Sequence, residues 1–209
     1  RSAIAGQRGK IRAGFFNILP KNEMVTPWLE FLQRACGIDQ LELVSGDMKF
    51  LENSLRDGSL DICLTNIYDF TQLPDFDYEI LLTVPTQIVV SQLHPWAGKS
   101  AITREDMAEA DMLQMKQTSP ASSDSFYSRV RCRSVRMVPD LDAMLVTLES
   151  GRFFAVFPPV FDYRDRANYL YFNLPAEDSF QAYTICACHK HHSSMLARDL
   201  VRRSHEALH

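Results

Sequence analysis

The chain has 209 residues, of which 46% are hydrophobic, and a formal net charge of −4 at pH 7. This length suits one globular unit or two small lobes whose core needs no disulfides. The negative charge argues against a nucleic-acid surface over most of the chain, and without an apolar run of about 20 residues nothing in it can span a bilayer as a helix. Five cysteines, an odd number without a disulfide framework, indicate reduced thiols and a cytoplasmic protein. Because the chain opens on Arg1 without a secretory signal pattern, we expect it to be a fragment.

The first 44 residues read as strand, helix and strand. Residues 10–16 form the first strand, and a helix then begins near Pro20 and ends at Gly37. The apolar positions of this helix are Met24, Trp28, Phe31, Leu32 and Ala35. A second strand covers residues 41–44, so the pattern predicts parallel strands joined by crossover helices.

Residues 46–66 are the stretch around which the rest of the chain is organised. Met48, Leu51 and Leu55 recur at i, i+3 and i+7, which predicts a short helix that ends at Gly58. Residues 60–64 then form a strand covered on both faces, and Thr65 and Asn66 follow it. Open α/β sheets bind ligands just beyond the carboxyl ends of their strands. The stretch therefore predicts a recognition scaffold more than a catalytic one.

The remaining residues again alternate between predicted strands and predicted helices. Residues 80–84 and 88–90 are two β-rich runs separated by too few residues for a helix, so the chain either turns back or runs on into a second lobe. Thr103 and Asp106 match a helix-start box, Asp140 caps a later helix, and Ser193 or Ser194 caps the last helix. Further strands are expected at 112–115, 135–138, 153–157, 169–174 and 183–187, and residues 117–124 as a polar loop leading into a helix near Phe126. The sequence thus predicts an α/β protein with two lobes.

Several short motifs occur in an order that is specific when they are taken together. Residues 11–14 (IRAG), 19–20 (LP) and 46–62 are followed by SQLHPWA at 91–97 and by a helix, a glycine, a strand and a proline within 140–158. This order resembles the effector-binding domain of LysR-type transcriptional regulators, whose corresponding stretch reads S-x-x-H-P-L-A. Residues 151–153 (GRF) depart from the family's usual glycine-rich form.

The resemblance implies a two-lobed fold of the type 2 periplasmic-binding-protein kind, with a small-molecule effector in a crevice between the lobes. Lobe one would comprise residues 1–86 and 160–209, and lobe two residues 87–159. It also implies DNA binding only through a helix-turn-helix that precedes this region and is absent here, and assembly as a homodimer or tetramer. The helix over residues 24–36 is apolar on more than one side, so we expect part of it to face a partner, or else to be buried in its own lobe.

Strand ends and helix N-termini would line such a crevice. Carried onto this sequence, the effector-contacting positions are Asn17, Ile18, Met48, Thr65, Asn66, Gln117, Thr118 and Ser119. Many relatives have hydroxyls where this chain has Asn17 and Met48, which argues against a small carboxylate effector. Helix capping by Asn17 and Ser119, and a turn at Asn66, are equally weighted alternatives. We expect Asn66 at a surface crevice, so that Asn66→Ala leaves the fold nearly intact.

A cluster of possible metal ligands, Cys186, Cys188, His189, His191 and His192, fits none of the standard zinc spacings, so we expect no metal and no other cofactor. A basic run, Arg129, Arg131, Arg133 and Arg136, is expected to be a solvated face or a partner contact.

Catalytic motifs are missing from the sequence: it has no glycine-rich phosphate loop, no nucleophile elbow and no HExxH pair. The leading hypothesis is therefore a ligand-sensing domain of a LysR-type transcription factor rather than an enzyme. The alternatives are a type 2 periplasmic-like solute-binding protein of a transport system and, third, a small α/β enzyme.

Overall fold

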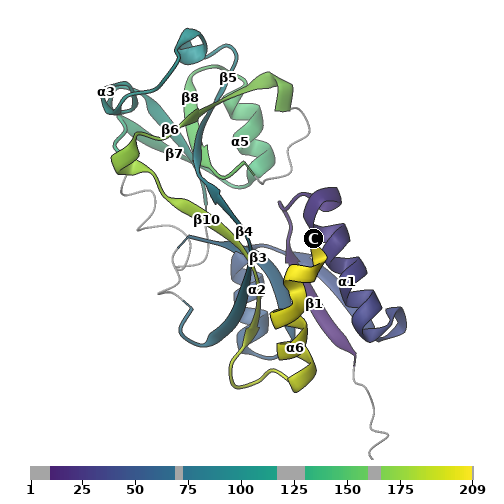
Figure 1. The fold of residues 1–209 in the computed structure, drawn as a ribbon. Coiled ribbons are helices and arrows are strands. Elements are labelled where there is room, and N and C mark those ends of the chain that lie inside the picture. Colours follow the sequence, from purple (N-terminus) through teal and green to yellow (C-terminus); the bar gives the residue numbers. More distant parts are fainter. Residues whose placement is uncertain (1–9, 69–72, 117–129, 160–165, 209) are drawn as a thin grey trace, which may run out of the picture. The chain divides into compact units, whose positions relative to one another are not determined.

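The computed structural model describes residues 10–68, 73–116, 130–159 and 166–208, which divide into two compact units (Figure 1). Unit 1 comprises the described residues within 1–66, 73–82 and 184–209, and unit 2 those within 67–72 and 83–183. Each unit contains one five-stranded sheet. Both units are therefore assembled from segments that lie far apart in the sequence.

The sheet of unit 1 has the strand order β2-β1-β3-β10-β4. Its strands are β1 (Ile11–Phe16), β2 (Leu41–Gly46), β3 (Ile62–Ile67), β4 (Phe76–Pro85) and β10 (Gln181–His189). β1 runs parallel to β2 and to β3. Gly14 of β1 is required by close packing, because a Cβ atom there would lie 2.6 Å from the side chains of Leu51 and Leu60.

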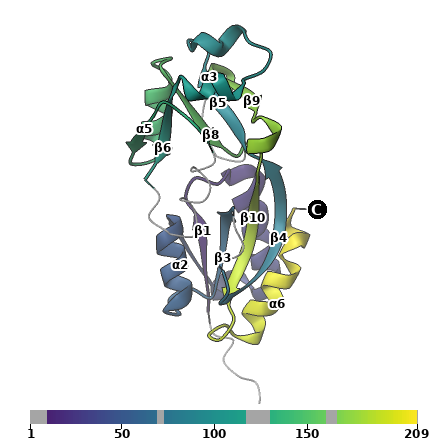
Figure 2. The ribbon, with the colours of Figure 1, turned by 90° about the vertical axis from the view of Figure 1, so that its left-hand side faces the viewer.

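Helices cover both faces of this sheet, with α2 on one side and α1 with α6 on the other (Figure 2). The helical segments are η1 (Lys21–Val25), α1 (Thr26–Cys36), η2 (Ile38–Gln40), α2 (Met48–Arg56), α6 (Met195–Arg203) and η8 (Ser204–Ala207). Asp47 caps α2 by accepting from Phe50 N, and Ser194 caps α6 by accepting from Ala197 N. Gly37 and Gly58 end α1 and α2 with positive φ angles.

Unit 2 has a mixed sheet with the order β7-β6-β8-β5-β9. β6 runs parallel to β7 and β8, whereas β5 runs antiparallel to β8 and β9. The strands are β5 (Gln87–Ser91), β6 (Asp111–Met115), β7 (Ser134–Val138), β8 (Phe153–Phe157) and β9 (Tyr169–Asn173). The helical segments are η4 (Pro95–Gly98), α3 (Arg104–Ala108), α5 (Leu141–Leu148), η6 (Arg166–Asn168) and η7 (Ala176–Asp178). Ile88, Trp96, Met107, Met112 and Phe154 belong to its buried core.

Most of the elements expected from the sequence are confirmed, including the capping box of Thr103 and Asp106 and the cap by Asp140. The run at 80–84 lies in β4, which passes from unit 1 into unit 2 at residue 83, and the run at 88–90 lies in unit 2, so the chain does run on from unit 1 into unit 2. The return to unit 1 comes at Thr184, later than the expected boundary after residue 159, because β9 pairs along its length with β5 of unit 2. The polar loop and the helix near Phe126 lie outside the described residues.

Most of the apolar side chains of the first helix are buried within unit 1. Trp28, Phe31 and Leu32 of α1 are 0%, 2% and 0% exposed, and Leu29 is half-buried. The first three therefore follow the alternative interpretation of burial in unit 1, and a partner contact through the rest of α1 stays a prediction.

Candidate functional site

The candidate effector site of unit 1 lies at one edge of its sheet, where three parallel strands end. Phe16, the last residue of β1, pairs with Gly46, the last residue of β2. Phe15 pairs with Leu64 of β3, so Thr65 lies next along the same edge. Asn17 N continues this arrangement by donating to Gly46 O at 3.0 Å, and α2 begins two residues beyond Gly46. The register therefore brings together the expected positions that come from separate parts of unit 1.

Asn66 occupies a buried position in β3. It is 1% exposed, and its Oδ1 accepts a 2.8 Å hydrogen bond from Thr184 Oγ1 of β10. Its Nδ2, which is also buried, has no hydrogen-bond partner among the described residues. An unpaired buried amide costs free energy, since it has left water without a replacement partner.

Thr65 presents a second group of this kind. Its Oγ1 is buried and likewise lacks a partner within the described part of the chain. Two adjacent side chains thus hold unsatisfied polar atoms at the carboxyl end of a central strand. That position is where open α/β sheets bind ligands.

The structure decides between the alternatives for two of the expected site residues. Asn17 is an exposed turn residue and caps no helix, because Pro20 precedes η1. Asn66 lies within β3 rather than in a turn, so the turn interpretation is wrong. The expectation of an exposed crevice position for Asn66 is also wrong, since the bond to Thr184 holds its side chain inside unit 1.

The other expected positions differ in what they offer. Ile18 and Met48 are half-buried, and Met48 is the first residue of α2. Gln117, Thr118 and Ser119 lie outside the described residues. Lys21 lies near the site, where its Nζ donates to Asn17 O at 2.9 Å. Thr65 and Asn66 thus supply neutral hydrogen-bonding groups, Met48 supplies a flexible apolar side chain at the start of α2, and Lys21 supplies a cation near Asn17.

The possible metal ligands do not form a metal centre in the described part of the chain, where no three His, Cys, Asp or Glu side chains are placed to hold an ion. Cys186 is fully buried, and burial raises the pKa of its thiol to about 12. The thiolate that a metal requires is therefore disfavoured. Among the described residues, every helix is too short or too polar to span a bilayer.

The chain folds into two α/β units, each built from one sheet and its helices. In unit 1, polar groups lie at the carboxyl edge of the sheet, where α/β proteins bind ligands. These features define a two-lobed α/β ligand-binding fold. The chain belongs to the family described as LysR substrate binding domain, whose family model matches residues 5–208. The resemblance inferred from the sequence is thereby confirmed. A search of curated proteins found no match.

Solved structures share the fold at low sequence identity. The C-terminal domain of a probable LysR family transcriptional regulator from Rhodococcus sp. RHA1 has a TM-score of 0.71 and 16% identity, covering 94% of this chain and 98% of that one. A reduced form of OxyR from N. meningitidis has a TM-score of 0.70 and 14% identity, with 94% of each chain covered. The reduced OxyR regulatory domain from Pseudomonas aeruginosa has a TM-score of 0.65 and 17% identity, covering 94% and 97%.

Family membership decides the class of function. The chain is a ligand-sensing regulatory domain of a LysR-type transcription regulator, rather than the solute-binding protein of a transport system. The family is one of regulators and not a known enzyme family. The chain spans 65% of a full-length OxyR and 66% of a full-length BenM, so it corresponds to part of those regulators.

Proposed function

We propose that this domain senses a small molecule at the carboxyl edge of the unit 1 sheet, with Thr65 Oγ1 and Asn66 Nδ2 as its polar contacts. The observation that carries the proposal is the pair of buried polar atoms left without partners in the described structure. Each such atom costs about 1–3 kcal/mol, and a ligand group that bonds to either atom recovers that atom's share of the free energy on binding. Asn17, Ile18 and Met48 complete the contacts from unit 1, and Gln117, Thr118 and Ser119 are proposed as the remaining contacts.

The chemistry of these groups indicates the kind of ligand. Asn66 Nδ2 is a donor, and Thr65 Oγ1 donates or accepts. A carbonyl, amide or hydroxyl on the ligand would satisfy either group without bringing a charge into a buried position, where an unpaired charge is costly. Met48 offers an adaptable apolar contact for the rest of the molecule. We therefore propose a neutral, polar effector rather than a small carboxylate.

The test is a pair of measurements on Thr65→Val, which removes the unpaired hydroxyl while keeping the side-chain volume. A library of neutral metabolites is first screened by thermal shift, and the strongest binder is titrated calorimetrically into both proteins. We expect the variant to lose about tenfold in affinity, as for one lost hydrogen bond, without a loss in stability. Thr147→Val, in unit 2, is the matched control. Equal affinity of Thr65→Val and wild type would contradict the proposal.

Regulators of this family bind DNA through an N-terminal domain and oligomerise. For this chain we propose DNA contact through a helix-turn-helix domain of the full-length protein, a cytoplasmic location, and assembly as a homodimer or tetramer. The five free cysteines support a reducing compartment. The two sheets support pairing at their edges, because β2 and β7 are edge strands with large apolar side chains exposed.

These edge side chains are Leu43 and Val44 on β2 and Val135 and Met137 on β7, which are 37–46% exposed. Sedimentation equilibrium of wild type, Leu43→Lys and Val135→Lys tests the pairing. We expect a wild-type dimer and weakened association in both variants, whereas Met195→Lys, at a side chain 89% exposed on α6, leaves it unchanged. A wild-type monomer at high concentration would refute this pairing.

A further inference from the structure

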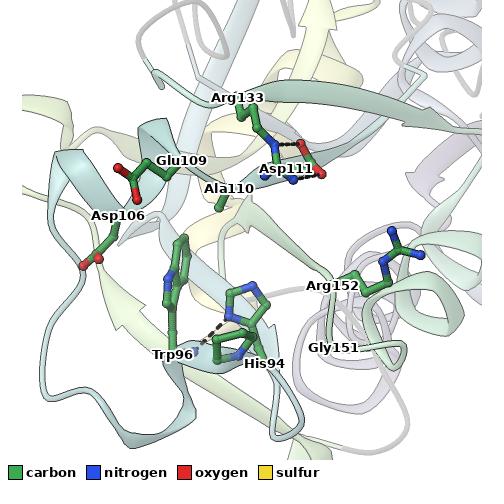
Figure 3. Close-up of a pocket in the computed structure, with 10 residues that line it drawn as sticks. His94, Trp96, Asp106, Glu109, Ala110, Asp111, Arg133, Gly151 and Arg152 are labelled. Atoms are coloured by element: carbon green, nitrogen blue, oxygen red, sulfur yellow. Dashed lines mark hydrogen bonds and ion pairs between the residues drawn. The ribbon is translucent and has the colours of Figure 1, made fainter.

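A hollow of about 380 Å³ lies wholly within unit 2 (Figure 3). It is formed at the amino-terminal side of β6 and β8, by η4, by α3 and by the turn that leads into β8. Its lining comprises His94, Pro95, Trp96, Asp106, Glu109, Ala110, Asp111, Arg133, Gly151 and Arg152. This volume is within the usual range of small-molecule sites. The hollow shares no residue with the candidate site of unit 1.

Two of the carboxylates that line the hollow are already engaged. Asp106 pairs with Lys99 and accepts from Thr103 N in the capping box. Asp111 accepts from both Arg133 and Ser134, and these hydrogen bonds lower the pKa of its carboxyl to about 2. These two carboxylates therefore stabilise the residues around the hollow and are not available to bind a ligand.

Two charged groups of opposite sign, the guanidinium of Arg152 and the carboxylate of Glu109, make no ion pair with any described residue. Arg152 does attract the neighbouring Asp111 carboxylate electrostatically. They lie on opposite sides of the hollow and do not reach one another (Figure 3). The hollow therefore has one free positive side and one free negative side.

His94 adds a neutral donor between the two charges. Its Nδ1 accepts from Trp96 N at 3.2 Å, and burial lowers the pKa of the imidazole. The ring consequently carries its proton on Nε2, for which the described part of the chain supplies no acceptor. The indole of Trp96 stands between His94 and Glu109 and supplies an apolar surface in the middle of the hollow (Figure 3).

The walls are held in place before any ligand arrives. Gly151 has φ = 71°, and a Cβ atom there would lie 2.8 Å from the carbonyl oxygen of Leu93. The turn that carries Arg152 is thus packed directly against the turn that carries His94. Such pre-organisation reduces the entropy lost on binding.

We propose that this hollow binds an elongated zwitterion of the ω-amino acid class. The carboxylate of the ligand pairs with Arg152 and accepts from His94 Nε2–H. Its ammonium group pairs with Glu109, and its methylene chain lies along Trp96 and Pro95. An α-amino acid places both charges on one carbon and is too short to reach the two sides together, so the length of the chain between the charges is the specificity element.

The experiment is a calorimetric titration of the 209-residue chain with the series from glycine to 8-aminooctanoate. We expect one-to-one binding with an affinity that passes through a maximum at an intermediate length. At that length, the alkanoate and the alkylamine, which each lack one charge, should bind at least about tenfold more weakly, as expected for a lost charge-assisted hydrogen bond.

Variants then locate the binding. Arg152→Ala and Glu109→Gln should each weaken it about tenfold, whereas their matched controls, Arg131→Ala and Glu105→Gln, change the same charges outside the hollow and should not. Thr65→Val should also leave it unchanged, so a failure here is distinct from a failure of the unit 1 site. No binding across the series, affinity independent of chain length, or no effect of Arg152→Ala would each overturn the proposal.

Discussion

Asn66 Oδ1 accepts a 2.8 Å hydrogen bond from Thr184 Oγ1, and this bond joins β3 to β10, two strands separated by 118 positions in the sequence. Both residues are 1% exposed. Asn66 is the last residue of unit 1 before the chain first enters unit 2, and Thr184 is the first residue after its final return, with residues 73–82 belonging to unit 1 in between. One buried hydrogen bond therefore joins, within unit 1, two residues that lie at boundaries between the units.

Thr184→Val should destabilise unit 1 by about 1–3 kcal/mol, because it removes the donor and leaves the second polar atom of the buried Asn66 amide unpaired. Urea unfolding measures the change. Thr65→Val is the matched control, since it removes a buried hydroxyl that has no partner among the described residues. Equal losses in the two variants would show that the bond to Asn66 adds nothing to stability.

The salt bridge between Arg104 and Asp178 supports the second prediction. Arg104 begins α3, and its Nε and Nη2 donate to the two Asp178 oxygens at 2.7 and 2.6 Å. The Asp178 side chain is only 6% exposed, so it cannot regain full hydration if the arginine is lost. We expect Arg104→Ala to lower the unfolding free energy of unit 2, because it leaves the buried Asp178 carboxylate without its partner.

The exposed pair of Lys99 and Asp106 provides the comparison for this measurement. Lys99→Ala should cost at most about 1 kcal/mol, because both side chains of that pair retain contact with water. Urea unfolding is followed by the fluorescence of Trp96 in a Trp28→Phe background, because the other tryptophan, Trp28, lies in unit 1. A cost for Arg104→Ala no greater than that for Lys99→Ala would contradict the argument from burial.

Local chemistry explains why so many elements could be predicted from the sequence. A helix cap needs only residues three positions apart, so Thr103 with Asp106, and Asp140, could be recognised directly. The stripe of Leu51 and Leu55 and the end of α2 at Gly58 are equally local. Pattern and spacing were therefore sufficient for most strands and helices.

Long-range pairing could not be predicted in the same way. β9 lies in the sheet of unit 2 because it pairs with β5, about 80 residues earlier, and no local pattern carries that information. The burial of Asn66 depends on Thr184 in the same sense. The hollow of unit 2 draws its lining from several segments, so its two free charges, on Glu109 and Arg152, could be recognised only in three dimensions.

Gly151 and Gly58 allow the third prediction, because they share a backbone conformation in different surroundings. Their φ angles are 71° and 74°. A Cβ atom at Gly58 would meet nothing within 4 Å, whereas at Gly151 it would press on the backbone of Leu93. Gly58→Ala should therefore cost about 1 kcal/mol for the left-handed conformation alone.

Gly151→Ala should cost clearly more, on the order of 2–4 kcal/mol, because a backbone clash is added to the same conformational strain. Thermal unfolding of both variants against wild type checks the difference. Similar losses in melting temperature would indicate that the turn relaxes away from Leu93 and that the wall of the hollow is not rigid.

The last prediction concerns the pH dependence of unit 1, through the three histidines that follow Cys188. His189 is 8% exposed, and its ring centroid lies 4.4 Å from that of His192 and 5.9 Å from that of His191. Burial, and then the neighbouring imidazoles and Arg56, lower the pKa of His189, while Asp75 opposes them. At mildly acidic pH, His189 therefore binds a proton less readily in the folded state than in the unfolded state.

The sign of the effect follows from this difference. As the pH falls through the ordinary histidine value of about 6.5, the unfolded state binds the proton first and stability decreases, whereas above that value the group has no effect. His94, whose pKa is lowered by burial, acts in the same direction in unit 2. The carboxylates titrate at lower pH, so the interval from about pH 7.5 to about pH 5 reports mainly on histidines.

His192→Gln removes the nearest imidazole and so allows His189 to take up a proton more easily in the folded state. We expect the variant to lose less stability than wild type between about pH 7.5 and about pH 5, measured by urea unfolding at each pH. His205→Gln, in η8 and outside the cluster, serves as the control and should follow the wild type. If His192→Gln and wild type lost the same amount, the repulsion between His189 and His192 would have no part in the stability of unit 1.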